Sequence, residues 1–197
     1  MSTGSVLDVW PTTFYRRQLD DVDELNVQLQ QDILEREETD KSRSLGVVGG
    51  RKSSPDLLRW ETPQTNRLAG FIAEAIDALS TSLSGQAAAT PSDFAAQAWA
   101  VVYRPGGYHT LHAHHDSAWS GVYYVAASAD ETSGGAIDLF DPRSAMLARH
   151  DDHGPTSLRI QPAPGLLIAF PSWLLHRVAP VSGSELRICI AFNVSFG

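Results

Sequence analysis

Leu186-Arg187-Ile188-Cys189-Ile190-Ala191-Phe192-Asn193-Val194-Ser195-Phe196, near the end of the chain, alternates strictly between two kinds of side chain. Every second position from Leu186 onward carries a large apolar residue, and the positions between them carry charged, small or polar residues. Side chains two apart on a strand point to the same face of a sheet. We therefore expect a strand whose apolar face packs under helices and whose other face lines a lumen that holds a ligand.

Other short β-prone runs, separated by Gly, Pro, Ser and Asp, fill the chain from residue 93 onward. About eight strands at short, regular spacing are typical of a barrel or a two-sheet jelly roll. The expected strands are Ala98–Arg104, Leu111–Asp116, Gly121–Ala127, Ala136–Phe140, Thr156–Ile160, Leu166–Phe170, Leu175–Pro180 and Leu186–Phe196.

The N-terminal third has a different pattern. A β-prone segment, Val6–Tyr15, precedes a helix expected from Asp20 to about Glu37, where apolar residues recur every three or four positions. Thr39–Ser54 is polar and Gly-rich, which predicts a loop of the kind that often covers a binding site. A second helix is expected to begin at Thr62-Pro63 and to end near Gly85. We predict one mainly β domain over residues 1–197, in which residues 1–92 support a β core formed by residues 93–197.

Composition limits the classes of partner. The net charge of −8 argues against binding to nucleic acid or to an anionic membrane surface. The N-terminus has no basic segment followed by an apolar run, and no apolar stretch approaches the ~20 residues of a membrane span. One cysteine excludes an internal disulfide, so a cytoplasmic location is expected.

Histidines are concentrated in Gly106-Gly107-Tyr108-His109-Thr110-Leu111-His112-Ala113-His114-His115-Asp116, and His176 follows about sixty residues later. Read as a strand, this segment places His112, His114 and Asp116 on one face. Imidazole and carboxylate ligands, with a distant third ligand, can hold a divalent transition metal and leave coordination positions open. The pairs His112-x-His114 and His114-x-Asp116 are both in register, so spacing alone does not choose between them.

Arg187 is the only cation on the lumen face of the last predicted strand. A guanidinium matches a carboxylate through two parallel hydrogen bonds, so Arg187 fits an anion clamp. The alternative is a surface salt bridge at the mouth of the barrel. The histidine cluster upstream favours the clamp.

Five ordered motifs carry a resemblance to a known family. The chain resembles the 2-oxoglutarate/Fe(II)-dependent oxygenases, in particular a bacterial and phage branch with the patterns G-x-Y-H-x-x-H-x-H, S-G-V-Y-Y-V, D-P-R, F-P-S-W-L-x-H-x-V-x-P and R-I-S-x-x-F-N. The corresponding runs are Gly106–His114, Ser120–Val125, Asp141–Arg143, Phe170–Pro180 and Arg187–Asn193. Cys189 stands where the branch often has Ser, which is a mild chemical change.

The resemblance implies a double-stranded β-helix (jelly roll, cupin-like) that uses Fe(II), 2-oxoglutarate and O2 to hydroxylate an unactivated C–H bond. Desaturation, ring closure and halogenation use the same type of site and stay open. We favour a metal site of three histidines, with Asp116 as the alternative carboxylate ligand. The residues assigned in this way are His112, His114 and His176 for the metal, Arg187 and Tyr103 for 2-oxoglutarate, and Arg143 and Asn193 for substrate.

Two other functions remain as alternatives: a metal-binding jelly-roll sensor without turnover, and a zinc hydrolase with three histidine ligands. For the oxygenase, the small single domain suits a small-molecule, amino-acid or peptide substrate. The loops Thr39–Ser54 and Arg149–Gly154 are the expected places for specificity, and the N-terminal helices are the expected surface of any homodimer.

Overall fold

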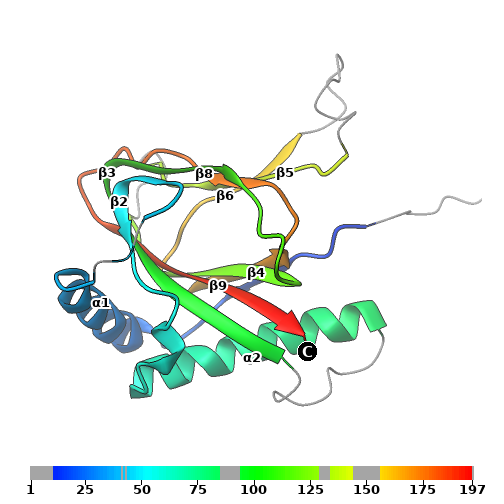
Figure 1. Cartoon of the computed structure of the whole chain (residues 1–197), viewed down its shortest axis with the longest axis horizontal. Helices are drawn as coiled ribbons and strands as arrows, with labels where there is room; N and C mark the ends of the chain where they lie inside the picture. The colour runs from blue at the N-terminus through cyan, green and yellow to red at the C-terminus, as the bar shows by residue number, and fades with distance from the viewer. Residues whose placement is uncertain are drawn as a thin grey trace, which may run out of the picture.

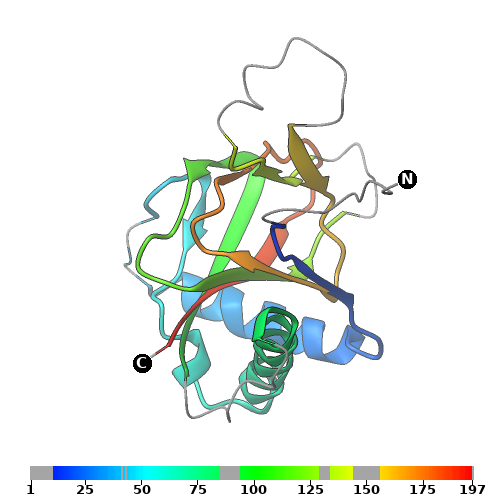
Figure 2. The same cartoon turned by 90° about the vertical axis from the view of Figure 1, so that its right-hand side faces the viewer.

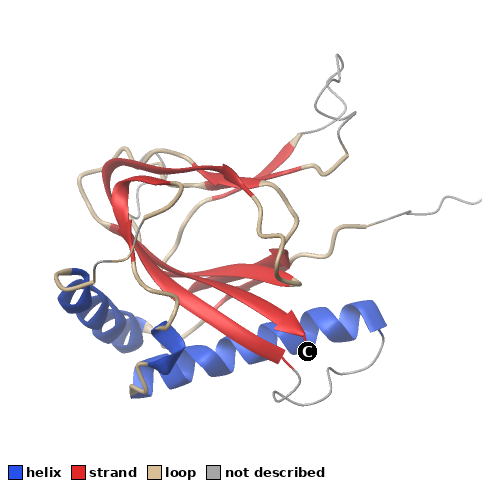
Figure 3. Cartoon of the chain, in the orientation of Figure 1, coloured by secondary structure: helices blue, strands red, loops and turns tan. Residues whose placement is uncertain are grey.

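The computed structural model describes residues 11–40, 42, 44–84, 94–128, 134–143 and 156–196. A curled antiparallel sheet forms its centre, and two helices lie along one side of that sheet (Figures 1 and 3). The strand order is β1-β7-β4-β9-β3-β8-β5-β6, and β2 pairs with β3 beside this path. A view turned by 90° shows that the sheet is curled into two layers, with the helices beneath the lower one (Figure 2). The mainly β fold with flanking helices is therefore confirmed.

The described elements follow the predicted order closely in the β core. Their bounds are β1 Tyr15–Gln18, α1 Asp23–Glu37, β2 Val47–Lys52, the 3-10 helix η1 Leu57–Arg59, α2 Pro63–Ser84, β3 Phe94–His112, β4 Trp119–Ala126, β5 Ile137–Phe140, β6 Ser157–Ile160, β7 Leu166–Pro171, β8 His176–Val178 and β9 Arg187–Phe196.

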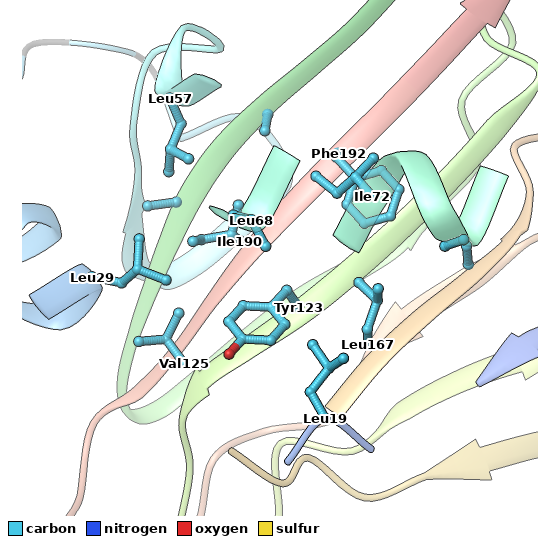
Figure 4. Close-up of a cluster of buried hydrophobic side chains, with 14 of the residues drawn as sticks. Leu19, Leu29, Leu57, Leu68, Ile72, Tyr123, Val125, Leu167, Ile190 and Phe192 are labelled. Atoms are coloured by element: carbon cyan, nitrogen blue, oxygen red, sulfur yellow. The ribbon is translucent and has the colours of Figure 1, made fainter. Parts of the chain in front are cut away.

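Strand β9 has the two faces that its alternation predicts. It pairs with β3 on one side and β4 on the other. The large side chains from Ile188 to Val194, including Ile190 and Phe192, are fully buried in a core shared with Leu68 and Ile72 of α2, while Phe196 at the end of the strand is exposed (Figure 4). Burying one such side chain stabilises a fold by roughly 1.5–3 kcal/mol. This core holds β9 in place, so its opposite face is fixed relative to the rest of the site.

The start of α2 also agrees with the sequence. Thr62 Oγ1 accepts a hydrogen bond from the backbone N–H of Thr65 at 3.3 Å, and Pro63 is the first helical residue. Pro is well suited to that position because it has no N–H to leave unpaired. The predicted end near Gly85 and most of the predicted strand Val6–Tyr15 lie outside the described residues. In the described part of the chain, no helix is long and apolar enough to span a membrane.

The prediction of a loop over Thr39–Ser54 is wrong for its second half. Strand β2 occupies Val47–Lys52 and pairs with β3. The glycines that suggested a loop allow close approach instead: a Cβ on Gly50 would lie 2.7 Å from the Val102 carbonyl oxygen. Glycine inside a strand often marks such a contact, and the register shifts between Val48 and Gly50.

The prediction of a separate strand over Leu111–Asp116 is also wrong. Strand β3 runs from Phe94 to His112 without interruption, pairs with β9 as far as Tyr103, and then pairs with β8. One strand therefore passes from one layer of the sheet to the other. Beyond His112 the chain leaves the sheet, so alternation no longer decides which way the following side chains point.

Candidate metal centre

Three histidines from two parts of the chain meet inside the curled sheet. His112 ends β3, His114 follows it, and His176 begins β8. One ring nitrogen from each lies within 4.8 Å of the others. His112 and His176 are direct partners across β3 and β8, while the backbone N–H of His114 donates to the Ser172 carbonyl at 2.9 Å. These contacts bring together the three histidines that the sequence analysis favoured.

Backbone carbonyls orient two of the rings. His112 Nδ1 lies 2.7 Å from the Thr110 oxygen, and His176 Nδ1 lies 2.7 Å from the Leu174 oxygen. A carbonyl can only accept, so each Nδ1 carries the hydrogen and donates it. The lone pair of each ring is then on Nε2, which is the form in which a neutral histidine binds a metal.

The third ring, His114, is held by a side-chain amide. Asn193 Nδ2 of β9 lies 3.3 Å from His114 Nδ1, and Asn193 Oδ1 accepts a hydrogen bond from the Ser120 hydroxyl of β4 at 2.8 Å. The His114 ring therefore turns its Nδ1 toward Asn193. Sequence reasoning assigned Asn193 to substrate, whereas the structure places its amide against a candidate metal ligand.

Burial keeps all three rings neutral at pH 7. Burial is the largest cause, and it lowers the pKa of His176 to about 3 and that of His114 to about 4. Burial also lowers the pKa of His112, against a backbone hydrogen bond that raises it. Metal ions bind unprotonated imidazole, so the cluster is ready to hold a cation at physiological pH without releasing protons.

Two other predicted site residues lie away from the cluster. Asp116 is an exposed residue of the turn after β3, and it is absent from the metal-binding group found among the described residues. Arg143 is also exposed and pairs with Asp141 at 2.6 and 2.9 Å. Sequence reasoning assigned Arg143 to substrate, whereas the structure places it in an ion pair with Asp141.

Arg187 is buried and lines the same pocket, with 3% of its surface exposed. Its Nε donates to the Gly135 carbonyl at 2.8 Å and its Nη1 contacts Cys189 Sγ at 3.3 Å. The guanidinium carbon lies 4.8 Å from the Tyr103 ring centre and 5.1 Å from that of Tyr124. No carboxylate is within ion-pair distance among the described residues. A buried, unpaired cation is costly, so this position suits an anionic ligand.

Tyr103 lies directly opposite Arg187 in the β3–β9 pairing and lines the pocket. Its hydroxyl is 3.5 Å from His109 Nδ1. Burial raises the pKa of Tyr103, so the phenol keeps its proton and can donate a hydrogen bond. The position agrees with a contact to a ligand carboxylate held by Arg187.

One pocket contains these groups, and Lys52 beside it was not assigned from sequence. The His109 ring stacks on His112 with centres 3.9 Å apart, and Lys52 lies over Trp99. Lys52 was missed because it sits in the Gly-rich segment interpreted as a loop. The lining residues are Trp99, Val101, Tyr103, His109, His112, His114, Ser120, Gly121, Val122, Ile137, Phe170, His176, Val178, Arg187, Cys189, Ala191, Phe192 and Asn193.

The family follows from the segment that builds this pocket. Residues 97–193 match the family described as "Putative 2OG-Fe(II) oxygenase". This segment belongs to the 2-oxoglutarate/Fe(II) oxygenase family. It contains the three histidines, Tyr103 and Arg187, so the family's metal and its cosubstrate each have a candidate site among the residues present. No curated protein matches the sequence.

Solved oxygenase structures share the fold. A prolyl-4-hydroxylase from Pseudomonas putida is 13% identical, with a TM-score of 0.69 and 94% of each chain covered. HygX from Streptomyces hygroscopicus, with nickel and 2-oxoglutarate bound, is 12% identical, with a TM-score of 0.64 over 93% of this chain and 83% of that one. A collagen prolyl hydroxylase from Paramecium bursaria Chlorella virus-1, in complex with 2-oxoglutarate, is 15% identical, with a TM-score of 0.63 over 93% and 96%. At these identities the likeness shows a common fold.

Proposed function

We propose that this oxygenase hydroxylates an unactivated C–H bond of a small molecule, amino acid or peptide. One atom of O2 enters the new C–OH group, and the other enters the succinate that forms as 2-oxoglutarate loses CO2. The observation that supports this most strongly is a buried guanidinium, with no acidic partner among the described residues, in the same pocket as three neutral, oriented histidines.

The histidines would hold the iron through Nε2, because their Nδ1 atoms face the Thr110 and Leu174 carbonyls and Asn193. Bound iron supplies the centre at which O2 is activated next to 2-oxoglutarate. Because the three ligands are neutral, iron keeps its full charge of +2, which favours binding of the 2-oxo acid group. They also leave open positions, as a facial triad requires.

Arg187 and Tyr103 would bind the far carboxylate of 2-oxoglutarate. Two guanidinium nitrogens are engaged with Gly135 and Cys189, and the remaining donors are available. The rings of Tyr103 and Tyr124 lie within 4.8 and 5.1 Å of the guanidinium carbon and restrict its movement. Arg187 is held in a water-poor site before the ligand arrives, so little ordering is needed on binding.

The first test is an anaerobic absorption titration with Fe(II) and then 2-oxoglutarate. We expect a visible charge-transfer band that needs both additions, because the 2-oxo acid chelates iron in this class. His112→Ala should abolish the band. Arg187→Met should raise the 2-oxoglutarate concentration needed for half of the band by roughly tenfold or more, because it removes a charge-assisted pair with the cosubstrate. Arg177→Met, which removes an exposed arginine next to His176, is the matched control and should leave the band unchanged.

Asp116→Ala chooses between the two metal triads. We expect it to bind iron like the wild type, because Asp116 is exposed and outside the histidine cluster. Loss of the band in Asp116→Ala with retention in His112→Ala would contradict the three-histidine site. A cluster that holds zinc and gives no band with iron and 2-oxoglutarate would favour the zinc hydrolase or the binding module instead.

A further inference from the structure

Lys52 brings a second positive charge to the pocket. It ends β2 and is the direct partner of Val101 on β3, so both side chains are on the same face of the sheet. Val101 lines the pocket. The Lys52 ammonium lies 4.1 Å from the centre of the Trp99 ring, and Trp99 is a further wall of the same pocket. Lys52 is therefore directed to the pocket side of β2.

This ammonium has no acidic partner. Within the described ranges, no carboxylate lies within 4.0 Å of Lys52, and its burial lowers its pKa with no pairing to raise it. The nearby Asp40 is engaged elsewhere: its carboxylate accepts the backbone N–H groups of Ser42 and Ser54, each at 2.8 Å. A half-buried cation without a counter-charge is costly unless a ligand supplies one.

Lys52 lies near the metal side of the pocket. The Trp99 ring that its ammonium contacts is 6.1 Å from the ring of the candidate ligand His114, between ring centres. A ligand that reached Lys52 would thus pass close to the metal centre.

The backbone around Lys52 is fixed independently of its side chain. Its N–H donates to Ser44 Oγ at 2.9 Å, and its carbonyl accepts from Ser42 Oγ at 2.6 Å. Trp99 restrains the ammonium by a cation–π contact, which has its strongest form with tryptophan. Such contacts are common on surfaces, but this one borders a pocket whose described lining residues include no Asp or Glu.

The charge balance indicates what binds there. Iron carries two positive charges, and Arg187 and Lys52 carry one each. The two carboxylates of 2-oxoglutarate would neutralise only two of these four, because the histidines are neutral. We propose that Lys52, restrained by Trp99, binds a carboxylate group of the substrate, so that the substrates of this enzyme are organic carboxylates. This rests on the proposed function, since it assumes that 2-oxoglutarate occupies Arg187.

The test compares carboxylates with uncharged counterparts of the same shape. Wild-type protein is loaded with Zn(II), which does not turn over, and saturated with 2-oxoglutarate to keep probes away from Arg187. A pool of N-acetyl amino acids and a pool of the corresponding N-acetyl amino acid amides are screened by saturation-transfer NMR, and the best pair is measured by calorimetry. We expect the carboxylate to bind roughly tenfold more tightly than its amide, or better.

Variants assign the preference to Lys52. Lys52→Met should remove the roughly tenfold preference, while Lys52→Arg should keep most of it, because the charge is retained. Arg51→Met is the matched control: Arg51 is the adjacent exposed cation on the other face of β2, and its loss should leave the preference unchanged. The proposal is overturned if no carboxylate binds better than its amide, if Lys52→Met keeps the preference, or if Arg51→Met loses it equally.

The charge-transfer band of iron with 2-oxoglutarate distinguishes failure of the Lys52 proposal from failure of the proposed function on which it rests. A wild-type protein without the band would mean that the proposed function has failed. A normal band in both wild type and Lys52→Met, with no preference for carboxylates, would overturn only the role of Lys52. A band lost in Lys52→Met and restored in Lys52→Arg would mean that Lys52 binds the cosubstrate, which also overturns substrate recognition.

Discussion

At the scale of single residues, each candidate metal ligand is oriented by one hydrogen-bond partner. Two partners are backbone carbonyls, which substitution does not remove, and the third is the amide of Asn193. Partners of this kind fix the tautomer and the direction of the ring. Asn193 is therefore the part of this support that mutation can test directly.

Asn193→Ala should weaken iron binding by roughly 10–100-fold, the usual cost of losing such a partner. Asn193→Asp should bind at least as well as the wild type, because a carboxylate accepts an Nδ1–H from His114 and so favours the tautomer that binds iron through Nε2. A competition titration against a coloured chelator under anaerobic conditions measures the affinity. Ser195→Ala, which removes an exposed hydroxyl further along β9, is the control. Equal affinity in wild type and Asn193→Ala would contradict this role.

At the scale of elements, alternation in the sequence predicted β9 correctly. It did not predict the chain after His112 or the strand β2 that carries Lys52. Strict alternation placed Arg187 on the lumen face and Ile190 on the core face, because a strand within a curled sheet has two different environments. Alternation failed after His112, where the chain leaves the sheet and His114 is positioned by Ser172 instead. It also missed Lys52, because β2 is formed by a pairing between segments far apart in sequence.

The close approach of β2 to β3 depends on Gly50. In Gly50→Ala the new Cβ would meet the Val102 carbonyl at 2.7 Å, and backbone cannot yield as a side chain can. We expect a loss of about 1–3 kcal/mol in the free energy of unfolding, the typical range for overpacking. Gly70→Ala is the matched control, since Gly70 is on α2 with nothing within 4 Å of the new atom. It should stabilise by roughly 0.5–1 kcal/mol, because alanine favours helix.

Urea unfolding measures both variants. A Gly50→Ala protein as stable as the wild type would mean that β2 shifts away from β3 at little cost. In that case the pairing of β2 with β3 would not hold Lys52 rigidly beside Trp99.

At the scale of the whole molecule, charge and burial are distributed unevenly. The chain carries a net charge of −8, yet among the residues that the structure describes the pocket lining has no acidic side chain and includes a buried arginine. The acidic exterior disfavours polyanions, while the interior attracts small anions. The same burial keeps several histidines uncharged, which couples the stability of the metal-free fold to pH.

His176 gives the clearest case, because only 5% of its surface is exposed. Burial lowers its pKa from 6.5 to about 3, so the unfolded chain binds a proton more readily than the folded protein. Stability from this residue is complete above pH 6.5 and is lost progressively as the pH falls toward 3. From pH 7.5 to 5.5, His176 alone should cost the metal-free protein about 1.4 kcal/mol, and His109 and His114 add smaller, partly screened amounts.

Urea unfolding of the metal-free protein at pH 7.5 and pH 5.5 measures this loss, and His176→Gln should show the smaller difference between the two pH values. Comparing differences removes the cost of the substitution itself. Asp138 and Asp40 do not interfere, because the pKa of each is lowered below 3.8 and their contributions are lost only in stronger acid. A pH difference as large in His176→Gln as in the wild type would show that His176 is not the buried neutral group responsible.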